Sequence, residues 1–227
     1  MKTIFLIFVA TLCVITSCQK KENTLNKSLQ KELEQIHDDD QKVRESSHLI
    51  REKYQNTNNS YKVDSVIKLM WKNDSQNQQK VKKIIDKYGW LGSEDIGQKA
   101  NQALFLVIQH ADFTMQKKYF PVMKNAVKLK KANSFDLALL EDRMLLYQGK
   151  KQIYGSQFMQ AANGIGFPFP VIDPDNLDKR RKSVGLEPIE EYLKQSGIKW
   201  NLEEYKKKLP EYEKVLKLFY EEYQKRV

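Results

Sequence analysis

Apolar residues recur every three or four positions along most of this chain, the spacing that places them on one face of an α-helix. The clearest stripe lies in residues 96–111, where six apolar residues keep to a single face. The chain is therefore predicted to be all-α, a mainly helical fold. Further stripes predict helices over residues 25–50, 63–70, 81–88, 119–129, 136–147, 178–184, 188–195 and 202–223.

Turn-forming residues mark the expected ends of these helices. Residues 55–60, with the sequence QNTNNS, predict a loop, and residues 73–75 are expected to end or kink the helix that contains them. Pro210 is expected to restart the last helix. The side chains expected to cap helix N-termini are those of Ser93, Ser134 and Asn201.

Two segments depart from the helical pattern. Residues 150–158 are too polar and too short for a helix, so we expect a short strand or extended loop there. Residues 163–175 hold three prolines and two glycines, which predicts an irregular segment that wraps over the body. No internal repeat or break in composition separates two domains, so we expect a single helical domain over residues 29–227.

The N-terminus has the pattern of an export signal. A positive start at Lys2 is followed by an apolar run eleven residues long, 4–14, whereas a membrane span needs about 20. Residues 15–18, ITSC, resemble the lipobox of bacterial lipoproteins, in which a signal peptidase cuts before a cysteine that carries diacylglycerol. This resemblance implies a lipoprotein signal peptide over residues 1–17, lipidation at Cys18 and a tether over residues 18–28.

An ordinary secretory signal with an accidental cysteine is the alternative, since Ile15 and Thr16 depart from the usual lipobox residues. Cysteine usage favours lipidation: Cys13 lies inside the apolar run, and Cys18 is the only other cysteine. Acyl chains such as palmitate at Cys18 would hold the protein on a membrane. Because Gln19 is not acidic, lipoprotein sorting rules imply the cell envelope, at the outer membrane facing the periplasm.

The formal net charge of +10 favours attraction to anionic lipid or glycan surfaces. We do not expect nucleic acid as a partner, because the lysines occur in short runs such as residues 206–208. These runs lack the interleaved aromatic residues that nucleic-acid binding needs. The charge therefore points to an envelope partner.

The predicted helix over residues 136–147 is apolar around most of its circumference, yet Asp142 and Arg143 interrupt it. A guanidinium group is always ionised, so it must find hydrogen-bond partners or reach water. This helix therefore predicts a polar site inside the helical body.

Signatures of known catalytic classes are absent from the sequence. It has no glycine-rich phosphate loop, no H-E-x-x-H, no G-x-S-x-G and no cysteine after Cys18 for nucleophilic work. With three histidines in all, we predict no metal site. A core histidine bonded to a neighbouring carbonyl or carboxylate is an open interpretation of His110.

Several short motifs occur in a fixed order, and their arrangement resembles an uncharacterised family of bacterial helical domains found in exported and lipid-anchored proteins. The resemblance covers about residues 36–195 and implies a common fold and a common polar cluster, without a substrate or cofactor. The motifs are D-Q-x-x-R (Asp40, Gln41, Arg44), G-W (Gly89, Trp90), Q-H-A-D (residues 109–112), D-R (Asp142, Arg143), Q-x-Y-G-S-Q (residues 152–157) and D-x-R-R-x-x-V-G-L-x-P-I-x-E-Y (residues 178–192).

We hypothesise that the polar residues of these motifs converge at one end of the helical body, with the acids paired to the arginines. Amide, phenol and guanidinium groups suit a small polar or anionic ligand, such as a sugar, a peptide carboxylate or a cell-wall fragment. The predicted ligand-binding residues are Asp40, Gln41, Arg44, Gln152, Tyr154 and Gln157.

Two alternatives stay open. In a hydrolase, His110 would act as general acid or base, Asp112 or Asp142 would orient it, and Arg143 with Gln157 would stabilise negative charge. In a structural or interaction protein, the ion pairs would only fix helix packing, or an exposed aromatic stripe at residues 212–223 would meet a partner. Enzymatic activity is thus undecided by the sequence.

Overall fold

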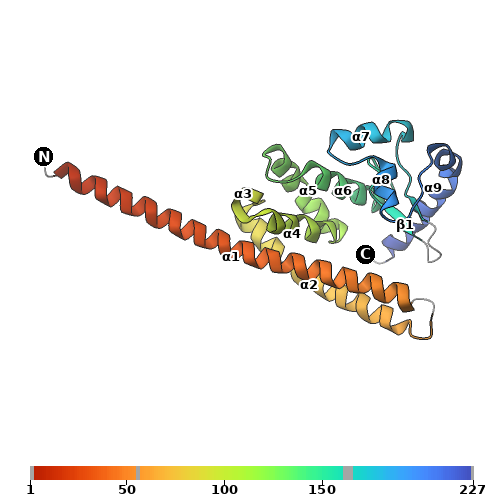
Figure 1. Ribbon diagram of the computed structural model, residues 1–227, viewed down its shortest axis with the longest axis horizontal. Coiled ribbons are helices and arrows are strands. Elements are labelled where there is room, and N and C mark those ends of the chain that lie inside the picture. Colours follow the sequence, from red (N-terminus) through yellow and green to blue (C-terminus); the bar gives the residue numbers. More distant parts are fainter. Residues whose placement is uncertain (1–2, 55–56, 161–165, 226–227) are drawn as a thin grey trace. The chain divides into compact units, whose positions relative to one another are not determined.

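The computed structural model describes residues 3–54, 57–160 and 166–225, with side chains from residue 27 onward except that of Gln160 (Figure 1). Within these residues the fold is mainly helical with one two-stranded antiparallel sheet, which confirms the all-α prediction. The elements are α1 (Thr3–Tyr54), α2 (Tyr61–Tyr88), α3 (Ser93–Ile96), α4 (Gln98–Gln109), α5 (Phe113–Lys128), α6 (Ser134–Leu146), β1 (Phe158–Gln160), β2 (Gly166–Pro168), the 3-10 helix η1 (Pro174–Asn176), α7 (Leu177–Ser183), α8 (Ile189–Lys194) and α9 (Leu202–Gln224).

The chain forms two compact units, Met1–Val107 and Ile108–Val227, and the boundary falls near the end of α4. The predicted signal peptide, Cys18 and most of the tether precede the residues whose side chains are described. None of the helices, as far as the chain is described, combines the length and apolar character that crossing a membrane requires.

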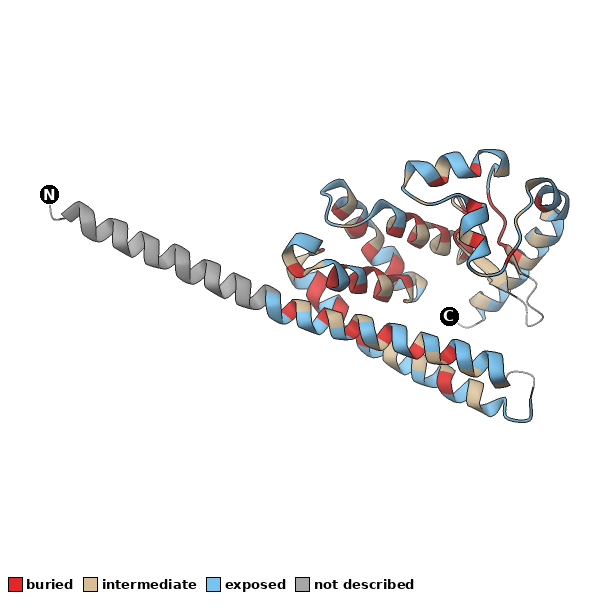
Figure 2. Ribbon diagram, viewed as in Figure 1, coloured by how far each residue is buried: buried red, intermediate tan, exposed pale blue. Residues whose placement is uncertain are grey.

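In the first unit, α1 and α2 lie side by side (Figure 1). The predicted apolar stripes are buried, with Leu33 and Val81 each 0% exposed, and Figure 2 shows the buried positions in red. Residues 73–75 do not end the helix, since α2 runs from Tyr61 to Tyr88. Asp74 instead bonds to Arg44 of α1, so packing overrides a weak local preference for a break.

The predicted helix over residues 96–111 begins with a separate short turn. α3 ends at Ile96, and Gly97 has a φ of 83°, a left-handed conformation that interrupts the helix before α4. Ser93 is the first helical residue and not the cap. Gly92 holds the cap position, and its N–H donates to an Asp95 carboxylate oxygen over 2.9 Å.

In the second unit, α9 docks through its apolar face. Leu216 is 4% exposed and packs in a cluster with Leu146 and Phe169, and the rings of Tyr147 and Tyr223 stack at 4.3 Å. The apolar face of α9 is therefore packed within this unit, and its aromatic side chains are partly buried. Pro210 does not restart the helix, because α9 runs through it with buried anchors on both sides.

Residues 150–158 form no helix and end at the first residue of β1, as expected. A parallel bridge pairs Gln152 with Val171, and regular pairing begins at Phe158, which lies opposite Pro168 in the β1–β2 ladder. The described part of the proline-rich segment contains β2 and η1. A core cluster of Val171, Leu177, Ile189, Leu193, Ile198 and Tyr205 joins this segment to α7, α8 and α9.

Candidate functional site

The Q-x-Y-G-S-Q loop, residues 152–157, wraps around the carboxylate of Asp142. This aspartate is 0% exposed on α6. Its oxygens accept N–H donors from Ile153 at 2.8 Å, Tyr154 at 3.0 Å and Ser156 at 2.9 Å. Gly155 makes the bend with a φ of 67°, and a Cβ there would lie 3.3 Å from Val171 and Ile189 side chains. Asp142 therefore organises the loop.

Opposing effects act on the pKa of Asp142. Burial raises it and is the largest cause, while the hydrogen bonds from the backbone of the loop lower it, and the net shift is upward. The charge of this carboxylate is satisfied by oriented backbone amides. Its hydrogen-bonding capacity is largely used within the fold.

The amide of Gln152 ties the loop to the segment that follows β2. Its Nε2 donates to the carbonyl oxygens of Gln157 at 2.9 Å and Phe169 at 2.8 Å, and its Oε1 accepts the Gln157 N–H at 2.7 Å. Gln152 is 0% exposed. Each of these bonds is internal, so the predicted ligand-binding residue Gln152 is engaged in holding the loop.

Two arginines of α7 hold the carbonyl oxygens of the same loop. Arg180 Nε donates to Ile153 at 2.8 Å, and Arg181 Nη1 donates to Tyr154 at 2.7 Å. Arg181 is 0% exposed, and its guanidinium lies 4.8 Å from the ring centroid of Tyr192. Burial lowers the pKa of Arg181. The predicted site did not include these arginines, although the D-x-R-R motif contains them.

Tyr154 contacts Asp142 and Arg181 through its backbone N–H and carbonyl groups. Burial, followed by the neighbouring charges of Glu141 and Asp142, raises the pKa of its phenol, while Arg180 lowers it. The phenol therefore stays protonated at neutral pH and can donate a hydrogen bond.

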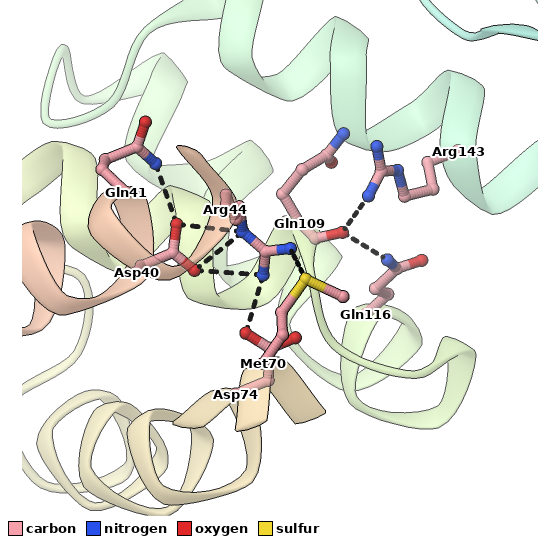
Figure 3. Close-up of polar contacts among 8 residues, drawn as sticks. All are labelled: Asp40, Gln41, Arg44, Met70, Asp74, Gln109, Gln116 and Arg143. Carbon is pink, nitrogen blue, oxygen red and sulfur yellow. Dashed lines mark hydrogen bonds and ion pairs between the residues drawn. The ribbon is translucent and has the colours of Figure 1, made fainter. Parts of the chain in front are cut away.

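Arg143 lies beside Gln157, as predicted, and reaches the turn between α4 and α5. Its Nε donates to Gln157 Oε1 at 3.0 Å, and its Nη1 donates to the Gln109 carbonyl oxygen at 3.0 Å. Gln116 Nε2 donates to the same Gln109 oxygen at 3.1 Å (Figure 3). It also donates to the Ala111 carbonyl oxygen at 3.1 Å. We call Gln109, Gln116, Arg143 and Gln157 the amide cluster.

Two acceptors of the amide cluster have no donor among the residues that the structure describes. Gln109 Oε1 and Gln116 Oε1 are buried without a hydrogen-bond partner, and the two residues are 4% and 0% exposed. The orientation of Gln116 is set, because its Nε2 already serves two carbonyl oxygens. Two buried oxygens are thus left in need of N–H or O–H donors.

His110 and Asp112 lie in the turn after α4, which ends at Gln109. His110 is half-buried, whereas Asp112 is exposed and caps α5, with a carboxylate oxygen that accepts the Met115 N–H at 2.8 Å. Asp112, which was predicted to orient His110, therefore serves as the N-terminal cap of α5. Within the described part of the chain, no three His, Cys, Asp or Glu residues are grouped to hold a metal ion.

The remaining predicted residues form a separate cluster in the first unit. Arg44 Nη2 donates to Asp74 at 2.7 Å and lies 3.1 Å from Asp40, and Gln41 donates to Asp40 at 2.8 Å (Figure 3). Asp40 is 1% exposed. Burial raises the pKa of Asp74, and the adjacent Arg44 opposes this shift. The D-Q-x-x-R motif thus forms a partly buried ion-pair network that joins α1 to α2.

Fold and geometry together define a mainly helical protein whose D-R and Q-x-Y-G-S-Q motifs form one hydrogen-bonded assembly. Residues 27–203 match the model of a family of unknown function, DUF6624, and the chain belongs to this family. The match extends beyond the predicted limits of 36 and 195 at both ends, and nearly all of α9 lies outside it. No curated protein and no solved structure matches the chain.

Proposed function

We propose that this protein is a lipid-anchored protein of the cell envelope that binds a small polar ligand at the amide cluster. The supporting observation is the pair of buried oxygens, Gln109 Oε1 and Gln116 Oε1, that lack donors. A buried acceptor left without a donor costs about 1–3 kcal/mol. A ligand with hydroxyl or amine hydrogens would remove this cost.

The chemistry of the cluster favours a ligand that donates hydrogen bonds. The two amide oxygens can only accept them. Hydroxyl groups of sugars and amino groups of peptides supply such donors. Fragments of cell-wall glycan or peptide are therefore the ligand class that the proposal favours.

Binding fits this geometry better than hydrolysis does. A hydrolase would need Asp112 or Asp142 to orient His110, but each of these carboxylates already accepts backbone N–H donors. A carboxylate that caps a helix or organises a loop is poorly placed to accept the hydrogen bond that would orient His110. The proposal therefore assigns the cluster to recognition.

Anchoring at Cys18 is the second part of the proposal. The lipobox-like residues 15–18 support it, and the family match begins later, at residue 27. An acylated N-terminus would keep the domain beside the cell wall, where glycan and peptide fragments occur.

The proposal is tested by replacing Gln109 with methionine, which at similar side-chain volume removes the unpartnered oxygen and the long 3.4 Å hydrogen bond from Nε2 to the Leu139 carbonyl. Calorimetric titration with sugars and cell-wall peptides should give binding to the wild-type chain and about tenfold weaker binding to Gln109→Met, with unchanged or higher stability. Gln148→Met is the matched control, since both ends of that amide are partnered within the fold.

A different result would contradict the proposal. If no probe binds at millimolar concentration and Gln109→Met lowers the free energy of unfolding by more than about 1 kcal/mol, the oxygen serves internal packing or a trapped water.

A further inference from the structure

A recess of about 520 Å³ opens in the second unit between β2, residues 197–201 and the first turns of α9. This volume lies within the range of about 300–1,000 Å³ typical of small-molecule sites. Its lining includes neither Gln109 nor Arg143, so the recess is distinct from the amide cluster. Its α9 residues, from Glu204 onward, lie outside the family match, whereas the lining residues of β2 and of the segment 197–201 lie within it.

Four aromatic side chains form a continuous row along the recess. Ring centroids are 4.8 Å apart for Trp200 and Tyr205, 5.6 Å for Tyr205 and Tyr212, and 4.1 Å for Tyr212 and Phe167. Such a row offers apolar faces whose negative potential attracts polarised C–H groups.

The middle of the row is held by Tyr205, which is 4% exposed. Its hydroxyl accepts the Val171 N–H at 2.9 Å and donates to the Phe169 carbonyl at 3.2 Å. Gly166 of β2 also packs closely against Ile198, since a Cβ on Gly166 would lie 2.6 Å from the Ile198 side chain. The aromatic side of the recess is therefore preorganised in the absence of a ligand, which reduces the entropy cost of binding.

Polar groups at the recess are available to a ligand. The Trp200 indole N–H and the Tyr212 hydroxyl make no hydrogen bond within the described residues. Lys208 pairs with Glu204 at 2.7 Å, whereas Lys199 and Glu211 make no ion pair in the part of the chain that the structure describes. The rim thus supplies donors and acceptors with balanced charge.

We infer that this recess binds a neutral saccharide, with one sugar ring stacked on the aromatic row and its hydroxyls bonded to the polar rim. The balanced rim disfavours a phosphate-bearing ligand, although the whole chain carries a charge of +10. Unpartnered N–H and O–H groups beside apolar faces match a sugar, which has C–H faces and a hydroxyl edge.

The test uses the full chain in a detergent without a sugar head group, titrated with tri-N-acetylchitotriose and with cellotriose by calorimetry. At least one trisaccharide should bind, and Trp200→Ala should weaken its affinity by about tenfold or more. Trp71→Ala is the matched control, because Trp71 is a 61% exposed tryptophan on α2 of the other unit. The affinity of this variant for the trisaccharide should stay within about twofold of the wild-type value.

A second variant guards against misfolding of Trp200→Ala. Tyr212→Phe keeps the ring stacked on Phe167 and removes only the hydroxyl, so the affinity should fall about three- to tenfold. Gln109→Met should leave this binding unchanged, which separates the recess from the amide cluster. The inference is overturned if neither trisaccharide binds, if binding survives both recess variants, or if adenosine binds equally well.

Discussion

At the scale of single residues, two buried aspartates of α6 satisfy their charge in different ways. Asp142 accepts three backbone N–H donors from one loop. Asp136, 5% exposed, has one hydrogen bond among the described residues, from Asn133 Nδ2 at 3.2 Å. Burial raises the pKa of Asp136 to about 6, which the Asn133 bond only partly opposes. Folding therefore makes protonation of Asp136 easier than in the unfolded chain, although most of the carboxyl groups are still ionised at pH 7.

This raised pKa predicts a dependence of stability on pH. Because the folded pKa of about 6 exceeds the ordinary value of 3.8, the stabilising contribution is present below pH 3.8 and is lost as pH rises through 6. Asp136→Asn should remove this loss and raise the free energy of unfolding at pH 7 by about 1–3 kcal/mol. Urea unfolding of wild type and variant at pH 4 and pH 7 measures both effects.

Asp64→Asn is the control, since Asp64 also lies in the first turn of a helix but is exposed. Both substitutions remove a helix-dipole interaction of about 0.3–1 kcal/mol, so the difference between them reports burial. A variant Asp136→Asn that is less stable than wild type at pH 7 would show that the carboxylate is charged and well solvated in the folded protein.

At the scale of elements, α6 and α7 both hold the loop of residues 152–157, α6 with a negatively charged acceptor and α7 with positively charged donors. Asp142 of α6 takes the N–H groups, while Arg180 and Arg181 of α7 take the carbonyl oxygens. A segment without regular hydrogen bonding thereby has its buried backbone groups satisfied. The loop can be as well ordered as the helices around it.

Replacing Asp142 by asparagine should therefore destabilise the second unit. The asparagine has a single acceptor oxygen, and its NH₂ group would face backbone N–H donors of the loop, which should cost about 1–3 kcal/mol. Urea unfolding gives the loss of stability. Hydrogen exchange at the amides of Ile153, Tyr154 and Ser156 should accelerate first.

Glu141→Gln is the neighbouring control on α6. Burial, followed by repulsion from Asp142, raises the pKa of Glu141, so the removal of its charge should be neutral or stabilising. If Asp142→Asn were as stable as wild type and its loop amides exchanged no faster, the carboxylate would not be what organises the loop.

At the scale of the whole molecule, the proposal of envelope anchoring depends on the N-terminal segment. Cys18→Ser should abolish incorporation of labelled palmitate and move the protein from the membrane fraction to the soluble fraction of expressing bacteria. Fractionation followed by mass spectrometry of the N-terminus measures both changes.

Cys13→Ser is a matched control, because Cys13 lies inside the predicted signal peptide and should be discarded with it. This variant should keep both the label and the membrane location. Lipid label that persists in Cys18→Ser, or a wild-type chain without acyl groups, would contradict the anchor and leave an ordinary secretory signal as the better interpretation.

Much of the helical architecture could be predicted because helical periodicity is a local property. The stripe that contains Leu33 and the cap at Asn201 follow from spacing and residue type alone. Breaks were harder to predict, since α2 continues through residues 73–75 and α9 continues through Pro210. In α2, packing outweighs a weak local signal. In α9, the packing of Tyr205 and Leu216 on either side of Pro210 outweighs the cost of a proline inside a helix.

The sequence also predicted which polar side chains need hydrogen-bond partners inside the fold. An arginine in the middle of an apolar helix required partners, and Arg143 has them in Gln157 and the Gln109 carbonyl. The identity of the partners could not be derived, because side-chain type does not specify which distant backbone group comes within 3 Å. The role of Arg181 was missed for the same reason.

The sequence alone thus determined the helical class, the family motifs and the need for buried charge to be satisfied, since these depend on periodicity and residue chemistry. Only the tertiary structure decided that Asp142 binds a loop backbone, that two glutamine oxygens lack donors, and that four aromatic rings line one recess. Those outcomes depend on contacts between residues far apart in the chain, which form only when whole elements pack.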